Sequence, residues 1–151
     1  MAKGNGEGFA AGPLHLVKMA VGASDLDHLR RNRAERLAER GESWIYTRNH
    51  PRRAGEVLDG GSLYWVVKGQ VRARERIIGF RTKHDDNGRA YCLILTDGVF
   101  VATLPRAFRP FQGWRYLTPG DVPKDAPGGP GGDFTAMPDH MLVELRELGL
   151  I

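Results

Sequence analysis

The chain has 151 residues, of which 41% are hydrophobic and 26% charged, the ordinary balance of one soluble globular domain. Its formal net charge of +4 permits an acidic partner such as nucleic acid without requiring one. No apolar run approaches the roughly 20 residues that span a bilayer, and no apolar signal segment opens the chain, so we expect a cytoplasmic protein with no membrane partner. The single cysteine, Cys92, excludes an internal disulfide and a cysteine-rich zinc site.

We expect a disordered, glycine-rich tail over 1–12 and a single α+β domain over 13–151. The helix predictions rest on a capping box at Ser24–Asp27 and on Gly41, which ends the helix. The elements predicted in chain order are a strand over 14–21, a helix that runs to Arg40, a strand over 43–48, a short helix over 51–58, and strands over 63–68, 71–81, 90–96, 99–104 and 115–117.

Tight turns separate the strand patterns between residues 63 and 104. Asn87-Gly88 and Asp97-Gly98 are typical of two-residue hairpin turns, because both central positions of such a turn need positive φ. Strands joined in this way form an antiparallel meander. Because many short strands would leave open edges, we expect the sheet to close into a small β-barrel flanked by helices.

Glycine and proline dominate residues 119–133, and this composition predicts a flexible loop within the domain. Beyond it, Leu142, Leu145 and Leu148 lie at helical spacing and predict a short amphipathic helix over 138–148. The apolar face of this helix offers a surface to a partner or a second copy.

Three arginines alternate along the strand predicted over 71–81. Because alternate residues share a strand face, Arg72, Arg74 and Arg76 are predicted to form a row spaced by about 6.6 Å, which suits successive phosphates. The competing interpretation is a solvated face paired to carboxylates. Glu75 lies on the opposite face, either as a paired inward charge or as the guard of an edge strand.

Two glycines precede the strongest predicted strand, where Gly61 is followed by Ser62. Tyr64 and Lys68 share one face of this strand and Trp65 lies on the other, and a register change of one residue exchanges them. One face belongs to the core, and the other is a candidate site. The alternative is a helix end followed by a core strand, because a phosphate loop would need a helix after the glycines.

Two further groups combine arginine with a helix start or with aromatic rings. A helix beginning at Pro51 directs its amides toward an anion, and the aromatic segment over 105–117 lets nucleobases stack on Trp114. Trp114 serves equally well as a core anchor of that segment. The cations of the two groups are Arg48, His50, Arg52 and Arg53 in the first, and Arg106, Arg109 and Arg115 in the second, where Tyr116 is the alternative ring for stacking.

Catalytic signals are poor. The five histidines are scattered with no pair at metal-ligand spacing, so we expect no metal and no cofactor. Cys92 lies among apolar neighbours in a predicted strand and is interpreted as a small buried residue. An enzyme that acts on nucleotides or nucleic acid is an alternative, with His50 and either Glu56 or Asp59 as its acid and base.

Three segments carry a family resemblance: GGSLYWVVKG at 60–69, FQGWRYL at 111–117 and ELGLI at 147–151. They resemble an uncharacterised alphaproteobacterial family of unknown function. The resemblance extends over nearly all of the chain from Leu14 onward, and it implies no activity.

The order of the predicted elements, with a tryptophan-bearing strand near the middle, is also similar to the PUA-like superfamily, which includes the EVE and ASCH domains. This similarity implies a pseudo-barrel that binds RNA or modified bases in a cleft near Tyr64, Trp65 and Lys68, edged by the turn over 48–53. It is an analogy of fold.

We therefore expect a non-catalytic domain that binds RNA or a modified base by stacking, with arginines on phosphate. A further alternative is a protein-interaction module that uses the helix over 138–148. The residues predicted to contact nucleic acid are Arg48, His50, Arg52, Arg53, Ser62, Tyr64, Trp65, Lys68, Arg72, Arg74, Arg76, Arg109, Trp114 and Arg115.

Overall fold

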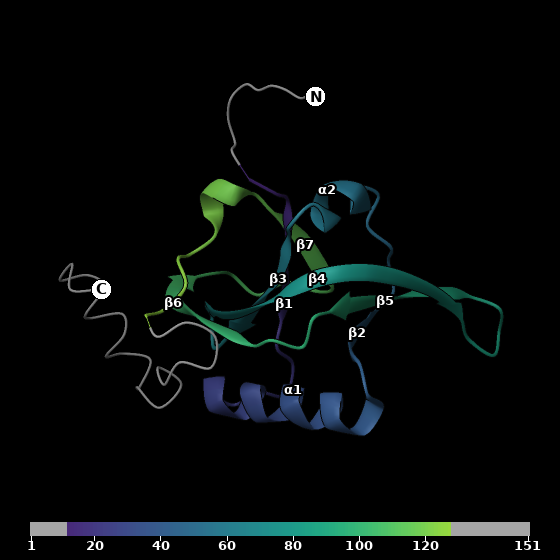
Figure 1. The fold of residues 1–151 in the computed structure, drawn as a ribbon, viewed down its shortest axis with the longest axis horizontal. Coiled ribbons are helices and arrows are strands. Elements are labelled where there is room, and N and C mark those ends of the chain that lie inside the picture. Colours follow the sequence, from purple (N-terminus) through teal and green to yellow (C-terminus); the bar gives the residue numbers. More distant parts are fainter. Residues whose placement is uncertain (1–11, 128–151) are drawn as a thin grey trace.

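The computed structural model describes residues 12–127 and shows a sheet with one long helix beside it (Figure 1). The predicted helix over 138–148 and nearly all of the predicted tail lie outside the described residues. The elements are β1 (His15–Met19), α1 (Leu26–Arg40), β2 (Ser43–Thr47), α2 (Ala54–Leu58), β3 (Ser62–Val67), β4 (Gln70–His84), β5 (Ala90–Thr96), β6 (Val101–Ala107), β7 (Trp114–Leu117) and the short 3-10 helix η2 (Pro119–Asp121).

The seven strands form one mixed sheet in the order β2-β5-β4-β3-β1-β7, with β6 paired to β4 off this path. The expected barrel is wrong, because the sheet stays open. β4 has 15 residues, and its first part pairs with β3 and β6 while its second part pairs with β5, so the sheet branches. The expected antiparallel meander is also incomplete, because β5 pairs with β2 and β4 while β6 pairs with β4, so the turn at Asp97-Gly98 does not join paired strands. Outside the meander, β1 pairs with β3 in parallel.

The ends of α1 are fixed by local hydrogen bonds. The helix begins after Asp25, whose side chain accepts a hydrogen bond of 2.8 Å from the amide of His28. Gly41 ends it with a φ of 74° and donates to the carbonyl of Leu37, as the sequence predicts. Only Leu26 and Leu29 are buried, so α1 packs on the sheet along a narrow stripe.

Residues on opposite faces of the sheet belong to two hydrophobic clusters. Trp65 packs in the larger cluster with Leu16 and the α1 residue Leu29, whereas Tyr64 packs in the smaller cluster with Val17. Both faces of β3 are therefore covered, and all six of its residues are buried. The register that the sequence leaves open thus places both aromatic rings inside the protein.

The described part of the glycine- and proline-rich segment lies against β6. Hydrogen bonds join the amide of Leu104 to the carbonyl of Lys124 and the amide of Ala126 to the carbonyl of Ala102, at 2.8 and 2.9 Å. The bridge between Thr103 and Asp125 adds to this pairing. The first part of the expected flexible loop is therefore held in place, because its backbone pairs with the edge of β6.

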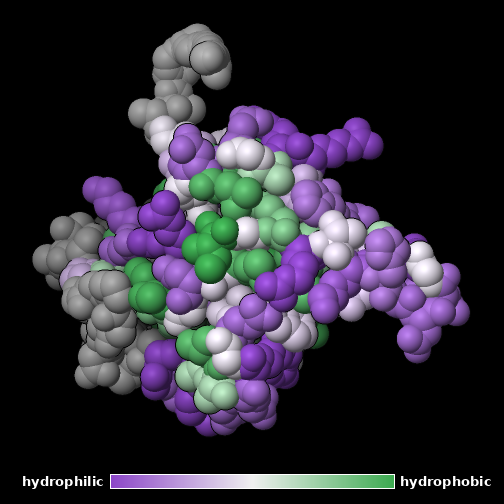
Figure 2. Space-filling model, turned by 45° about the vertical axis from the view of Figure 1, so that its right-hand side comes forward, coloured by the Kyte–Doolittle hydropathy of each residue, from purple (hydrophilic) through white to green (hydrophobic). Residues whose placement is uncertain are grey.

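Figure 1 shows the hairpin of β4 and β5 reaching away from the rest of the sheet, and Figure 2 shows that this arm is largely hydrophilic.

Between residues 12 and 127, neither α1 nor α2 is long and apolar enough to cross a membrane.

Candidate nucleic-acid interface

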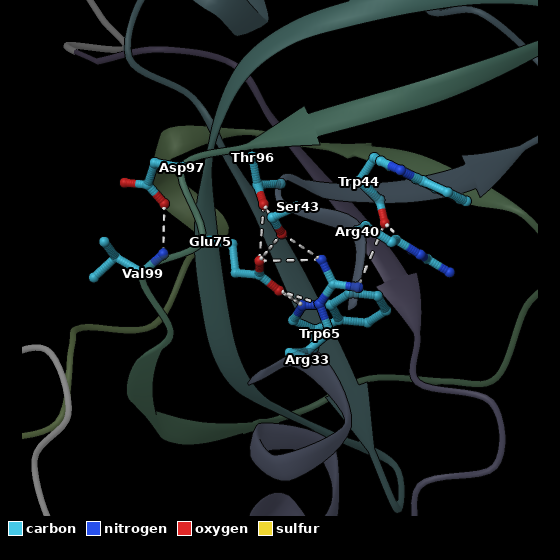
Figure 3. A network of polar contacts seen from close by, with 9 residues as sticks. All are labelled: Arg33, Arg40, Ser43, Trp44, Trp65, Glu75, Thr96, Asp97 and Val99. Carbon is cyan, nitrogen blue, oxygen red and sulfur yellow. Dashed lines mark hydrogen bonds and ion pairs between the residues drawn. The ribbon is translucent and has the colours of Figure 1, made fainter. Parts of the chain in front are cut away.

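A buried carboxylate joins α1 to the sheet (Figure 3). Glu75 is 1% exposed, and its two oxygens accept hydrogen bonds from the guanidinium of Arg33 at 2.7 and 3.3 Å. The indole N–H of Trp65 donates at 2.9 Å, and the hydroxyls of Thr96 and Ser43 donate at 2.8 and 3.2 Å. Of the two interpretations of Glu75, the structure confirms the paired inward charge.

This network commits Trp65 to a structural contact. Its ring is 5% exposed and lies 5.5 Å from the guanidinium carbon of Arg33, within cation–π distance. Because its N–H is used by Glu75, Trp65 forms a wall of the space beside α1 rather than an open stacking surface. The network thereby fixes the position of α1 relative to the strands that carry Trp65 and Glu75.

A cavity of about 230 Å³ opens beside the network, between α1 and the ends of β1 and β2. We call it the basic cavity, because four of its lining residues are cations and none is a carboxylate. Its lining includes Lys18, Arg33, Arg36, Arg40, Trp44 and Trp65. An anion with an aromatic or apolar body suits such a lining.

Two cations of the basic cavity, Arg40 and Lys18, are held where their charges are costly. The guanidinium carbon of Arg40 stacks 3.5 Å from the ring centre of Trp44, and burial together with Arg36 and Arg33 lowers the pKa of Arg40. Burial also lowers the pKa of the Lys18 ammonium. A bound anion would relieve this desolvation and mutual repulsion.

The outer face of β2 and β5 carries three aromatic rings, Trp44, Tyr46 and Tyr91, which we call the aromatic platform. In β2, Ser43 and Ile45 are buried while Trp44 and Tyr46 alternate with them outward. The rings of Tyr46 and Tyr91 lie 5.1 Å apart, and Tyr46 is 47% exposed. The aromatic platform is thus an accessible surface on the sheet.

Cations surround the aromatic platform. The guanidinium carbon of Arg48 lies 5.9 Å from the ring centre of Tyr46, and Arg40 covers Trp44. A groove of about 700 Å³ on the same side is lined by the platform rings together with Arg81 and Lys83. The carboxylates at this groove are Glu42, Asp85 and Asp86, of which Glu42 is held by Arg81 at 2.9 Å and Asp85 lies 3.7 Å from Arg48.

The predicted row of arginines on β4 does not form. Arg72 is completely buried, because a β-bulge against β3 sets it between the pairs Trp65–Ala73 and Val66–Val71. Arg74 is held by both carboxylate oxygens of Asp125 at 2.8 and 2.7 Å and donates to Ser62. Arg76 is exposed. The three side chains therefore lie in three different environments.

Ser62 and Tyr64 are also enclosed. They are 3% and 4% exposed, and the backbone amide of Ser62 donates to Nδ1 of His15 at 2.9 Å. The ring of Tyr64 meets the His15 imidazole edge-on at 5.2 Å. Burial raises the pKa of Tyr64 to about 12, so its phenol stays protonated. Lys68, by contrast, is exposed at the β3–β4 turn.

His15 gives the fold a dependence on pH. Burial, and secondarily the charge of Arg74, lowers its pKa from 6.5 to about 4, so the folded protein binds fewer protons than the unfolded chain between these values. The stabilisation is present above pH 6.5 and is lost as the pH falls toward 4. Between pH 7.5 and 4.5, a His15→Asn variant should lose about 2 kcal/mol less of its free energy of unfolding than the unmodified protein, and its amide oxygen can still accept from Ser62. Urea unfolding at the two pH values measures both losses. Equal losses in the two proteins would contradict the role given to His15.

The structure brings together the two loop groups that the sequence singles out. The indole of Trp114 donates to the carbonyl of Asn49 at 2.9 Å, and the phenol of Tyr116 accepts from the amide of Arg53 at 3.0 Å. The turn over 48–53 therefore packs on β7. Of the predicted cations here, His50, Arg52, Arg53, Arg109 and Arg115 are exposed, and Arg48 is half-buried.

Residues proposed for the enzyme alternative have structural contacts. Glu56 accepts from the Arg53 side chain through both of its oxygens at 2.7 Å, and Nδ1 of His50 lies 3.0 Å from the carbonyl oxygen of Pro51. Cys92 is completely buried, as expected. No group of three or more His, Cys, Asp or Glu within residues 12–127 is arranged to hold a metal ion.

Apart from Trp65, sequence reasoning missed the residues that we describe for the basic cavity and the aromatic platform. The signal was present: Arg33, Arg36 and Arg40 follow one another at spacings of three and four, which places them on one helix face. Trp44 and Tyr46 alternate with buried residues in β2. Neither pattern by itself shows that the arginine face and the aromatic face meet.

Comparison with known proteins identifies the family. Neither the curated proteins nor the solved structures gave a match. The family model described as "Protein of unknown function (DUF1489)" matches residues 16–151, which covers all the described elements except the first residue of β1. The chain therefore belongs to the DUF1489 family.

Proposed function

We propose that the protein binds single-stranded RNA without catalysing a reaction, and that the bases stack on the aromatic platform. The observation that carries this proposal is the set of three rings on an accessible sheet face beside arginines and a lysine. Unpaired bases stack on such rings whatever their sequence, because every base has a π-face. A duplex hides its bases, so the aromatic platform favours single strands.

The charges around the aromatic platform fit the phosphate backbone of such a strand. Arg40 and Arg48 lie within cation–π distance of two of the rings, so each guanidinium can bind a phosphate while a base stacks nearby. Lys83 lies on the neighbouring strand, and its register partner is Tyr91. A nucleic-acid strand crossing β2, β5 and β4 therefore meets the rings of β2 and β5 first and then the cations of β4.

Recognition of a modified base in a PUA-like cleft is the narrower form of this proposal. Its support is the similarity in the order of helices and strands between this chain and the PUA-like superfamily, which is an analogy of fold. A modified base would have to be read at the aromatic platform, because Tyr64 and Trp65 are buried.

Removing platform rings tests the proposal. Tyr46→Ala and Tyr91→Ala should each weaken binding of single-stranded RNA at least fivefold, since one stacked base contributes about 1–3 kcal/mol. Anisotropy of a labelled oligonucleotide measures the dissociation constant. Val99→Ala is the control, because Val99 is 45% exposed but lies outside the groove. Wild-type affinity in both tyrosine variants would overturn the proposal.

A further inference from the structure

The basic cavity holds more positive charge than residues 12–127 neutralise through ion pairs. Arg33 is neutralised by Glu75 at 2.7 Å. Lys18, Arg36 and Arg40 also line the cavity, and none of these three forms an ion pair with a carboxylate of residues 12–127. Three cations without an ion pair to a described carboxylate thus share one small space.

Two of these cations, Arg40 and Lys18, are placed there at an energetic cost. Burial, and then the charges of Arg36 and Arg33, lower the pKa of Arg40 against the opposing charge of Glu39, and burial lowers the pKa of Lys18. Such an arrangement is disfavoured unless an anion enters it. The ligand that offsets several cations best is a compact group with more than one negative charge and several acceptor oxygens.

The basic cavity continues into the aromatic platform. Arg40, Trp44 and Tyr46 line both the cavity and the groove over the platform. Figure 3 shows Trp44 and Arg40 side by side next to the Glu75 network, at the junction of the two. A strand lying on the platform rings therefore has one of its ends within reach of Arg36 and Lys18.

We propose that the basic cavity binds the terminal phosphomonoester of an RNA strand whose bases lie on the aromatic platform; this inference rests on the proposed function. A terminal phosphate carries more charge than the single charge of an internal phosphodiester, which suits a cluster of three cations. The cavity is lined from α1, β1, β2, β3 and the segment between β1 and α1. A cavity bounded on these sides can receive the end of an RNA strand, because the strand does not have to pass through it.

Oligonucleotides that differ only at their ends test the inference. Four labelled single-stranded RNAs of one sequence are compared by anisotropy: a 5′-phosphate with a 3′-hydroxyl, the reverse, hydroxyls at both ends, and phosphates at both ends. One of the two singly phosphorylated strands should bind about tenfold tighter than the strand with two hydroxyls. Whichever singly phosphorylated strand binds more tightly identifies the end of the RNA that enters the cavity.

Variants locate the gain in the cavity. Arg36→Ala should abolish the preference for the phosphorylated end while changing the affinity for the hydroxyl-ended strand less than twofold; Arg36 is exposed, so this variant keeps the fold. Lys18→Met should act in the same direction. Arg31→Ala is the matched control, because Arg31 is an exposed arginine of α1 outside the cavity lining, and it should keep the preference.

The outcomes separate this inference from the proposed function. Equal binding of all four strands, or a preference that survives in Arg36→Ala, would overturn the terminal-phosphate site and leave binding at the aromatic platform standing. Absence of binding by all four strands would overturn both. A phosphate preference that disappears in Arg36→Ala and persists in Arg31→Ala supports the inference.

Discussion

Replacing Arg33 with methionine should lower the free energy of unfolding by about 3–5 kcal/mol, because it leaves a buried carboxylate without its cation. Glu75 is 1% exposed, and its remaining donors, Trp65, Thr96 and Ser43, carry no charge. Three neutral hydrogen bonds cannot offset the lost solvation of a full charge. Urea unfolding followed by tryptophan fluorescence gives the free energy directly.

Two further variants isolate the ion pair. Adding Glu75→Leu to Arg33→Met should recover much of the lost stability, because the buried charge is then absent. Arg30→Met serves as the control, since Arg30 lies on the same helix with a side chain 43% exposed and pairs only with Asp27 at the surface. If Arg33→Met cost no more than Arg30→Met, the Glu75 network would not be what joins α1 to the sheet.

Substituting Gly61 with alanine should cost about 3 kcal/mol or more, through a steric clash with the backbone. A Cβ atom at this position would overlap the carbonyl oxygens of Leu14 and Val57. Gly61 also donates to the carbonyl of Val57 at 2.7 Å and accepts from the amide of Ile77 at 3.0 Å, so it cannot move away without breaking these bonds. Thermal unfolding monitored by circular dichroism measures the loss.

Gly55→Ala provides the matched control. Gly55 lies in α2, and a Cβ added there meets no atom within 4 Å. Alanine favours helix by about 1 kcal/mol over glycine, so this variant should be neutral or slightly more stable. Similar melting temperatures for the two variants would show that Gly61 tolerates a side chain and that the close approach of β1 and α2 is not maintained.

Local signals predicted most of the secondary structure. Gly41 ends α1 because a left-handed residue is required there, and the strand predicted over 90–96 matches β5. These features depend on neighbours a few residues apart, which a sequence displays directly.

Long-range pairing was not predictable in the same way. Arg33 and Glu75 are separated by 42 residues, and only the packing of α1 on β4 brings them together. The sheet branches because β4 is long enough to pair with β5 at one end and with β6 at the other. The alternation of apolar and polar residues along a strand does not show which strands will pair.

The candidate site shows the same limit. Alternation alone places Arg72, Arg74 and Arg76 on one face, but a bulge at Arg72 interrupts the alternation and buries that side chain. Trp65, expected as a possible stacking residue, donates its N–H to a buried carboxylate. Arg48, expected at a helix start that binds an anion, has its guanidinium carbon 5.9 Å from the ring centre of Tyr46, a contact that was not predicted.

The measurement that tests RNA binding most directly is a titration of the unmodified protein with one labelled RNA, as a single strand and as a duplex, at two salt concentrations. The account predicts that the single strand binds more tightly than the duplex and quenches tryptophan fluorescence, because Trp44 lies on the aromatic platform. Three phosphate contacts would give a slope of about −2 in the logarithmic salt dependence. No binding at low salt, or equal binding of the two forms, would contradict it.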